Sequence, residues 1–315
     1  MEIGTSNRTA IRITPEINYG VTPNTPVFEP IRMTGESISV EFDNIVSNEI
    51  RNDRNRSDTV RVDQRVAGSI EFELSLGSFN TILEAVLGGT WSAPVANEST
   101  LKNGVINRSF TIQKYVADTT PDFYQNFVGC RFSTFDLNLS PGEFVTGSIG
   151  VMGKNGETSS TPITGQTLSA ESTSEVLNSV GNITAITDNG VTSTEVYRSM
   201  SISINGNLRP LQALSNLGPV DINLGTMDIT GNIELYFKDV TMYNRLVNND
   251  SFAMSIQLED STGDYLTIKL PRMKLESGEI TAGGLDQDLV VNATYRALYD
   301  SVSQCAIEIV KFDAP

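Results

Sequence analysis

The chain has 315 residues, enough for about two domains, and its hydrophobic content of 39% suits globular cores but is too low for a membrane protein. Its net charge of −16 and its lack of histidine remove the commonest general base and metal ligand, and argue against a surface that holds nucleic acid through clustered Lys and Arg. The sequence contains no run of about 20 apolar residues, the length needed to span a bilayer. Residues 1–8 lack the charged and apolar regions of a secretory leader. The two cysteines, Cys130 and Cys305, indicate no disulfide framework.

Residues 1–33 are predicted to form an extended arm. Pro15, Pro23, Pro26 and Pro30 each remove a backbone donor and disfavour the helical conformation in the residue before them. Such an arm either hangs loose or lies across a neighbouring surface.

A hairpin with a charged tip is predicted next, at the start of a first β domain over residues 34–153. Apolar and polar residues alternate over residues 36–42, the period of a half-buried strand, and a less regular strand follows over 60–66. The simplest interpretation of residues 43–59 is a solvated tip. The alternative is an arm that pairs with carboxylates of another subunit, since arginine suits bidentate contacts at interfaces. The candidate residues of this arm are Arg51, Asp53, Arg54, Arg56, Arg61 and Arg65.

A strand and a short helix follow the hairpin. Ile70, Phe72 and Leu74 share one face of the strand, and the period then changes to that of a helix over residues 78–87. Ser78 is placed to cap this helix, and the glycines at 88 and 89 can end it. The apolar stripe of the helix, expected to pack on a sheet, consists of Phe79, Ile82, Leu83, Val86 and Leu87.

The rest of the first domain is predicted to be a surface excursion followed by three strands. Residues 89–108 contain the only tryptophan, Trp91, and a turn signal at residues 103–104. Strands are expected over 109–115, 128–139 and 143–152, with a turn at Pro141-Gly142 between the last two. A connector rich in Ser, Thr, Asn and Gly is then predicted over residues 154–198, partly ordered by packing.

The second domain, residues 199–315, repeats the first. The motif GSIEFEL at residues 68–74 recurs as GNIELYF at 231–237, and the segment 37–43 recurs at 201–207. A short helix is again expected, over residues 241–249, with Met242 and Leu246 packing inward and Tyr243 and Val247 as further candidates. The sequence therefore predicts a mainly β chain of two tandem units, each a sandwich or barrel with one short helix. Two such copies suggest a structural subunit that assembles into a repeating array.

The two copies differ in the segment that follows their first strand. The second copy has an apolar, nearly uncharged segment over residues 208–219, where the first has its charged tip. An exposed apolar loop is rare in a monomer unless it has a partner. The candidate interface residues of this second-copy loop are Leu208, Leu211, Leu214 and Leu217.

No motif predicts a catalytic residue, a cofactor or a metal. Residues 259–264 resemble a calcium-binding turn but lack the loop length and bidentate glutamate of an EF-hand, and a hairpin between strands over 253–258 and 266–270 explains them. Lys274, Glu276 and Glu279 are interpreted as a cross-strand ion pair around a turn at residues 277–278. Phosphate loops, dinucleotide fingerprints and nucleophile elbows are absent from the sequence.

Several motifs in this order resemble a known family. A proline-rich start is followed by TGESISV at residues 34–40, IVSNEIRNDR at 45–54, VAGSIEFEL at 66–74 and a short helix that ends in GGTW at 88–91. This pattern resembles the tail tube proteins, or major tail proteins, of bacteriophages with long, non-contractile tails (siphoviruses). The resemblance is most specific over residues 15–91 and extends through the internal repeat to about residue 299.

The resemblance implies a β-sandwich with one helix, whose inner sheets join side by side into a barrel around a channel. Rings then stack, and a hairpin arm reaches the adjacent ring. In most such tubes six single-domain subunits make a ring, so a duplicated chain implies a trimer with pseudo-sixfold symmetry, with a hexamer as the second option. The implied partners are tape-measure and tail terminator or tip proteins, and the implied location is the virion tail, after synthesis in the bacterial cytoplasm.

The acidic charge then has an expected role, because carboxylates in the channel would repel DNA and let it pass without specific binding. Which acids face inward depends on strand register, since a one-residue slip reverses every side chain. The candidate lumen acids are Glu71, Glu73, Asp136, Glu143, Glu234, Glu276 and Glu279.

Three other classes compete with this interpretation. A carbohydrate-binding or adhesin-like β-sandwich would explain the strands and the Ser/Thr content, but would usually show a leader and exposed aromatic residues. A glycosidase could use two carboxylates, although no pair stands out. A tube of a related bacterial injection system or gene-transfer particle would share nearly every feature.

Overall fold

The computed structural model describes residues 4–281 and 284–314, and its fold is mainly β, as predicted. The helical elements of these residues are η1 (Ser6–Arg8), α1 (Asn80–Leu87) and α2 (Thr241–Asn248). The strands up to the predicted connector are β1 (Thr9–Pro15), β2 (Val27–Ile31), β3 (Gly35–Glu36), β4 (Ser39–Val46), β5 (Thr59–Glu73), β6 (Glu98–Lys102), β7 (Phe110–Val116), β8 (Phe123–Leu139) and β9 (Thr146–Gly153). The remaining strands are β10 (Asn155–Ser159), β11 (Thr167–Leu168), β12 (Ile183–Asp188), β13 (Val191–Thr192), β14 (Tyr197–Asn205), β15 (Arg209–Leu211), β16 (Asp221–Asn223), β17 (Asp228–Tyr236), β18 (Phe252–Glu259), β19 (Tyr265–Thr281), β20 (Val290–Ala297) and β21 (Glu308–Phe312).

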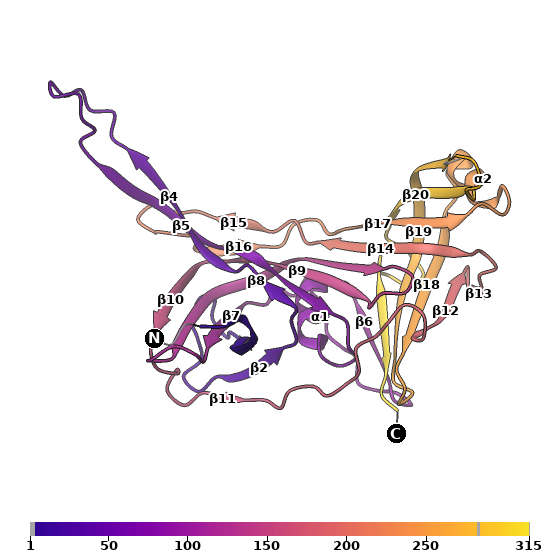
Figure 1. Ribbon diagram of the computed structural model, residues 1–315, viewed down its shortest axis with the longest axis horizontal. Helices are drawn as coiled ribbons and strands as arrows, with labels where there is room; N and C mark the ends of the chain where they lie inside the picture. The colour runs from indigo at the N-terminus through magenta and orange to yellow at the C-terminus, as the bar shows by residue number, and fades with distance from the viewer. Residues whose placement is uncertain (1–3, 282–283, 315) are drawn as a thin grey trace.

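One continuous antiparallel sheet runs through both copies. Its strands pair in the order β4–β5–β9–β8–β14–β17–β20–β19, so that β8 of the first copy lies beside β14 of the second. Figure 1 shows these strands side by side across the molecule. The first four and the last four strands follow the same pattern: two strands, a helix, and then the return of a long strand and its partner. The duplication read in the sequence is therefore also a duplication of strand order, while the domain boundaries at residues 33, 153 and 198 stay predictions.

A second layer of strands covers each copy. The long strands β8 and β19 leave the continuous sheet at their N-terminal halves, where β8 pairs with β7 and β10, and β19 pairs with β18 and β21. Apolar side chains between the layers form the core, which includes Ile70, Phe72, Phe135 and Ile233. Because each long strand belongs to both layers, the two layers of a copy are covalently continuous.

The helices follow the predicted pattern only in the first copy. All five residues of the α1 stripe are buried, and Gly88 ends the helix with a φ of 61°. The predicted cap is wrong, because Phe79 is the N-cap residue and the Ser78 hydroxyl bonds to that of Ser75. In α2, Met242 is buried and Leu246 packs against the core, but Tyr243 and Val247 are 42% and 64% exposed, so their predicted packing is also wrong.

Residues 1–33 contain core strands rather than an extended arm. β1 pairs with β7 over its whole length and with β2 on its other edge. Ile11, Ile13 and Phe28 are no more than 1% exposed. Of the prolines that suggested an arm, Pro15 ends β1 and Pro30 lies within β2, where an outer position in the sheet tolerates a missing donor, and Pro23 and Pro26 lie in the segment between the two strands.

The predicted surface excursion and connector are also more ordered than expected. Residues 98–102 form β6, which pairs with β21, and Leu101 is fully buried. The connector supplies β10 to β8, β11 to β2 and β12 to β18. Two strand pairings, β8–β14 and β6–β21, join the two copies directly, and the connector strands pair with both copies.

Candidate functional site: a polar sheet face and two hairpins

The continuous sheet has one apolar and one polar face, because side chains of a strand alternate between its two sides. In β5, Ile70 and Phe72 are buried in the core, whereas Glu71 between them is exposed on the opposite side. The same alternation holds in β14, where Ile202 and Ile204 are buried and Ser203 is not. We call the outer side the polar face.

Acidic residues occupy equivalent positions on the polar face of both copies. Across the first copy, Glu71 lies opposite Ser148, which lies opposite Asp136. Across the second copy, Glu234 lies opposite Asn292, which lies opposite Glu279. The two rows are counterparts, so five of the candidate lumen acids share this face once Glu73, two residues beyond Glu71, is included.

Two other candidate acids lie differently from the prediction. Glu143 belongs to the turn that precedes β9 and not to a strand, because β9 begins at Thr146. Glu276 is the extra residue of a β-bulge between Leu275 and Ser277, so the expected turn at residues 277–278 is wrong and β19 runs straight through it. The cross-strand ion pair expected there exists, but its partner is Arg296, which also bonds to Asp228 at 2.7 Å.

Basic residues on the polar face are largely engaged with these acids. Arg198 pairs with Glu234 at 2.8 Å, and Arg296 is held between Glu276 and Asp228. Within residues 4–281 and 284–314, no cation lies within ion-pair distance of Glu71, Glu73 or Glu279. The face therefore keeps an excess of negative charge.

The β4–β5 hairpin forms an arm that projects from the body (Figure 1). Its strands stay paired as far as Val46 and Thr59, which is longer than predicted, and we call residues 41–65 the first arm. Arg51 pairs with Asp53 at 2.7 Å, and this contact holds the pKa of Asp53 well below its usual range. Arg65 bonds to Glu41 and Asp43. Part of the predicted inter-subunit charge is thus already neutralised within the arm.

The remaining arginines of the first arm are freer. Arg61 stacks on the ring of Phe42 at 3.6 Å, and Arg56 bonds to the Ser47 carbonyl. In the part of the chain that the structure describes, neither Arg54 nor Arg56 has a carboxylate within ion-pair distance. The arm is also more apolar than its sequence suggested, since the side chains of Ile45, Val46, Ile50 and Val60 are at least 49% exposed.

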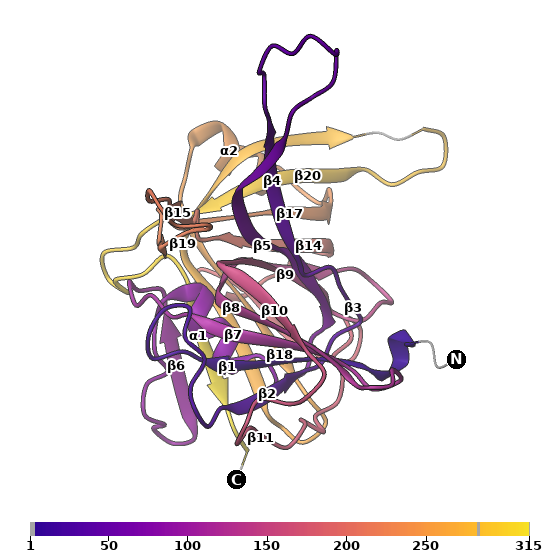
Figure 2. The same ribbon diagram turned by 90° about the vertical axis from the view of Figure 1, so that its left-hand side faces the viewer.

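The second-copy loop forms the β15–β16 hairpin and lies against the first copy (Figure 2). Gln212 donates to Asp63, and the Leu217 carbonyl accepts from Gln64. Leu211, Leu214 and Leu217 are exposed, with Leu214 at 96%, whereas Leu208 is half-buried.

A buried arginine fastens this hairpin. Arg131 of β8 is 6% exposed and bonds to Asp221 of β16 at 2.7 Å, with its guanidinium 5.0 Å from the centre of the Tyr19 ring. Burial lowers the pKa of Arg131 and raises that of Tyr19. Sequence reasoning missed this anchor, because three residues from distant segments make it and no local pattern announces it.

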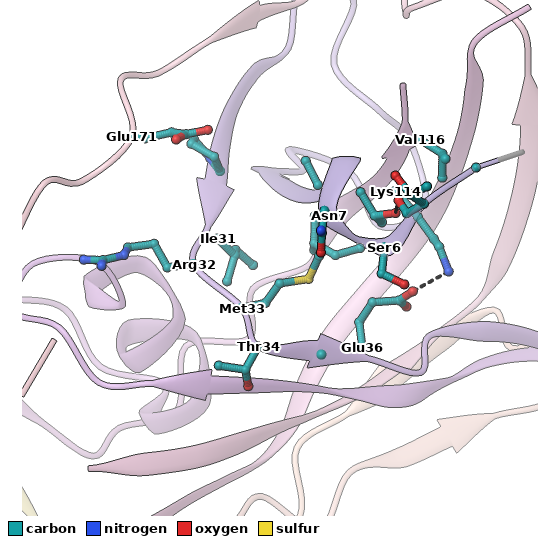
Figure 3. A pocket seen from close by; sticks show the side chains of 17 residues that line it. Ser6, Asn7, Ile31, Arg32, Met33, Thr34, Glu36, Lys114, Val116 and Glu171 are labelled. Carbon is teal, nitrogen blue, oxygen red and sulfur yellow. Dashed lines mark hydrogen bonds and ion pairs between the residues drawn. The ribbon is translucent and has the colours of Figure 1, made fainter. Parts of the chain in front are cut away.

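A groove with a volume of about 750 Å³ lies beside β1 and β7 (Figure 3). Three of its four charged side chains are engaged: Lys114 forms an ion pair with Glu36, and Arg32 donates to the Ser174 carbonyl. The fourth, Glu171, has no ion-pair partner among the described residues. Among the described residues, no group of three or more acidic or thiol side chains could hold a metal ion, and no helix is long and apolar enough to cross a membrane. Asp260 caps its own hairpin turn by accepting from Thr262 and Asp264, which accounts for the calcium-like sequence.

Comparison with known proteins identifies a family. A family model described as phage tail tube protein matches residues 6–297, nearly the whole chain. No curated protein matches the sequence.

Proposed function

Since the chain belongs to the phage tail tube protein family, we propose that it is a non-enzymatic subunit that closes into rings, and that the rings stack around the channel through which the genome is ejected. The family is a structural one, assembles into a tube and places the chain in the virion tail. Synthesis in the host cytoplasm and contacts with tape-measure, terminator and tip proteins belong to this proposal.

The observation that carries the proposal is the polar face of the continuous sheet. In the proposed ring this face lines the channel, with Glu71, Asp136, Glu234 and Glu279 repeated around it. Carboxylates repel DNA phosphates over a Debye length of roughly 8–10 Å, so DNA passes without a specific contact. Arg198 and Arg296 on this face are paired with its acids, and serine, threonine and asparagine side chains lie between the charged ones, so the face offers phosphate little free positive charge.

Two equivalent four-stranded groups per chain favour three chains in a ring. The β8–β14 contact already joins two such groups inside one chain. Three chains then supply six groups, and six chains, the second option, would supply twelve. The first arm is proposed to contact the adjacent ring, because it projects from the body with exposed apolar side chains and with two arginines, Arg54 and Arg56, that have no carboxylate partner among the described residues.

Electron microscopy of the purified protein at high concentration tests the assembly. Hollow stacked rings with threefold averages are expected. Open fibres or closed particles without a channel would contradict the tube, and sixfold averages would contradict the trimer.

A charge reversal tests the role of the polar face. Tubes with Glu71→Lys and Glu234→Lys are expected to retain DNA and to slow its release from reconstituted phage. The matched control is Glu157→Lys, which makes the same change at an exposed position on β10, away from this face. Equal ejection rates for both variants would contradict a channel lined by these acids.

A further inference from the structure

The joint between the two copies has a defined register. β8 and β14 run antiparallel, with Asp136 opposite Ser203, Leu137 opposite Ile202 and Phe135 opposite Ile204. The Ser203 hydroxyl donates to the Asp136 carboxylate at 2.5 Å, and the Gly206 amide donates to the Ser133 carbonyl at 2.9 Å. The joint therefore combines a backbone ladder with one side-chain bond on the polar face.

The sheet pairings give each residue of this joint a counterpart elsewhere in the chain. Gly35 lies opposite Glu71, and Ser199 lies opposite the equivalent Glu234, so that β4 corresponds to β14 and Ser39 to Ser203.

On the other side of each copy, Asp136 lies two strands from Glu71, and Glu279 lies two strands from Glu234 in the same register. β19 therefore corresponds to β8. The correspondence extends to the bulges, which lie between Phe132 and Thr134 in β8 and between Leu275 and Ser277 in β19. Two independent strand irregularities at equivalent positions make the alignment unambiguous.

The strand edges of β19 and β4, which correspond to the joined edges of β8 and β14, have no strand partner among the described residues at these positions. On the edge of β8 that carries β14, the N-terminal half pairs with β7. On the corresponding edge of β19, β18 pairs only as far as Met273, and no described strand continues beyond it. The edge of β4 that faces away from β5 has no strand partner in the described residues either.

Side chains at these edges are exposed where their counterparts are buried. Ile280 is 40% exposed, whereas its counterpart Leu137 is 1% exposed in the intrachain joint. Val40 is half-buried, whereas its counterpart Ile204 is 2% exposed. Open sheet edges with apolar side chains are a liability unless another strand covers them.

We propose that β19 of one subunit pairs antiparallel with β4 of the next, in the register of the β8–β14 joint. Ser39 of the next subunit then lies opposite Glu279, Val40 opposite Gly278 and Ile38 opposite Ile280. The Ser39 hydroxyl donates to the Glu279 carboxylate as Ser203 donates to Asp136, because the duplication has kept a serine and an acid at both places. This inference rests on the proposed function and specifies its partner, a second copy of the chain. It makes intrachain and interchain joints alternate around the ring.

Cysteine cross-linking in assembled tubes tests the register. The pair Ser39→Cys with Glu279→Cys is expected to oxidise between subunits and to give a ladder that stops at a closed ring, at three chains for a trimer. The native thiols do not compete, since Cys130 and Cys305 are fully buried and burial raises the pKa of both. The controls are the pairs Ser37→Cys with Glu279→Cys and Glu41→Cys with Glu279→Cys, which shift the register by two residues on the same face.

Each outcome decides a separate point. A ladder from the first pair alone supports the register. Rings that form but cross-link equally well or better through a shifted pair, or through none, overturn the register and leave the proposed function intact. Unmodified protein that forms no rings even when seeded with tail tips overturns both.

A second variant covers the case in which the cysteine pair does not fold. Ile280→Lys changes a side chain that is already 40% exposed in the isolated subunit, so its circular dichroism should match that of the parent. Ring formation should nevertheless be lost. Val191→Lys, at a 69% exposed position on β13, is the matched control and should assemble normally. Normal rings from Ile280→Lys would refute the joint.

Discussion

Replacing Asp221 with alanine is expected to destabilise the subunit and release the second-copy loop. The substitution removes the carboxylate that neutralises Arg131, the anchor of this hairpin. The Arg131 side chain is 7% exposed, and its Nε and Nη1 atoms have no hydrogen-bond partner among the described residues. The variant therefore leaves a charge in a site that burial already makes unfavourable, as the lowered pKa of Arg131 indicates.

The size of the effect follows from the exposure of the two partners. Breaking a fully buried ion pair from one side costs roughly 3–5 kcal/mol, and losing a hydrogen bond to a charged group costs about 1.5–3 kcal/mol. Asp221 is 39% exposed, so water can partly replace it. We expect a loss of about 2–3 kcal/mol in the free energy of unfolding.

Urea unfolding of the unassembled subunit measures this loss, with hydrogen exchange of residues 209–223 as a local readout. The matched control is Asp228→Ala, which breaks a pair to Arg296 whose side chains are 38% and 48% exposed, and it should cost less than about 1 kcal/mol. Exchange in the hairpin should quicken only for Asp221→Ala. If Asp221→Ala costs no more than the control, or the hairpin exchanges as slowly as before, Arg131 does not fasten it.

Three further outcomes are expected. Reversing the charge of Arg51, Arg54 and Arg56 should leave the circular dichroism unchanged but shorten tubes in electron micrographs, and tubes as long and as salt-resistant as those of the parent would argue against the first arm as a stacking contact. Serine at the three exposed leucines of the second-copy loop should raise solubility and block assembly; unchanged polymerisation by light scattering would show that the loop is no interface. The Asp53–Arg51 contact should be present at neutral pH and lost only as pH falls through the lowered pKa of Asp53. An NMR titration of Asp53 should therefore have its midpoint well below the ordinary value, and Arg51→Gln should raise that midpoint toward it, with the Asn55 amide still holding it somewhat lower.

Local periodicity predicted the elements whose packing depends on neighbours in sequence. The stripe from Phe79 to Leu87 determines the position of α1, because four or five adjacent apolar side chains can be buried only on one side of a helix. In α2 the same logic failed at Tyr243 and Val247, which sequence alone cannot distinguish from buried residues. A surface that serves assembly carries apolar side chains just as a core does.

Long-range pairing accounts for most of the errors. The prolines of β1 and β2 suggested irregular structure, since nothing nearby in sequence reveals that β7 pairs with β1. Assigning the candidate acids to one face of the sheet required the strand register. That register is known only from the strand pairings, which place Glu71 and Glu234 in equivalent positions. Glu143 was wrongly assigned to a strand because the strand-like sequence pattern starts a few residues before Thr146, where β9 actually begins.

The pairing of β6 with β21 has a consequence for the order in which the chain folds. β21 lies between β6 and β19, so residues 98–102 have their strand partner only when residues 308–312 are available. During synthesis at about 5–20 residues per second, β6 therefore waits on the order of ten seconds or more for its partner. Contacts so distant in sequence also slow folding, because the entropy of closing the loop is lost before the contact stabilises the chain. Late pairing of β21 thus makes the closure of both halves a single event near the end of folding.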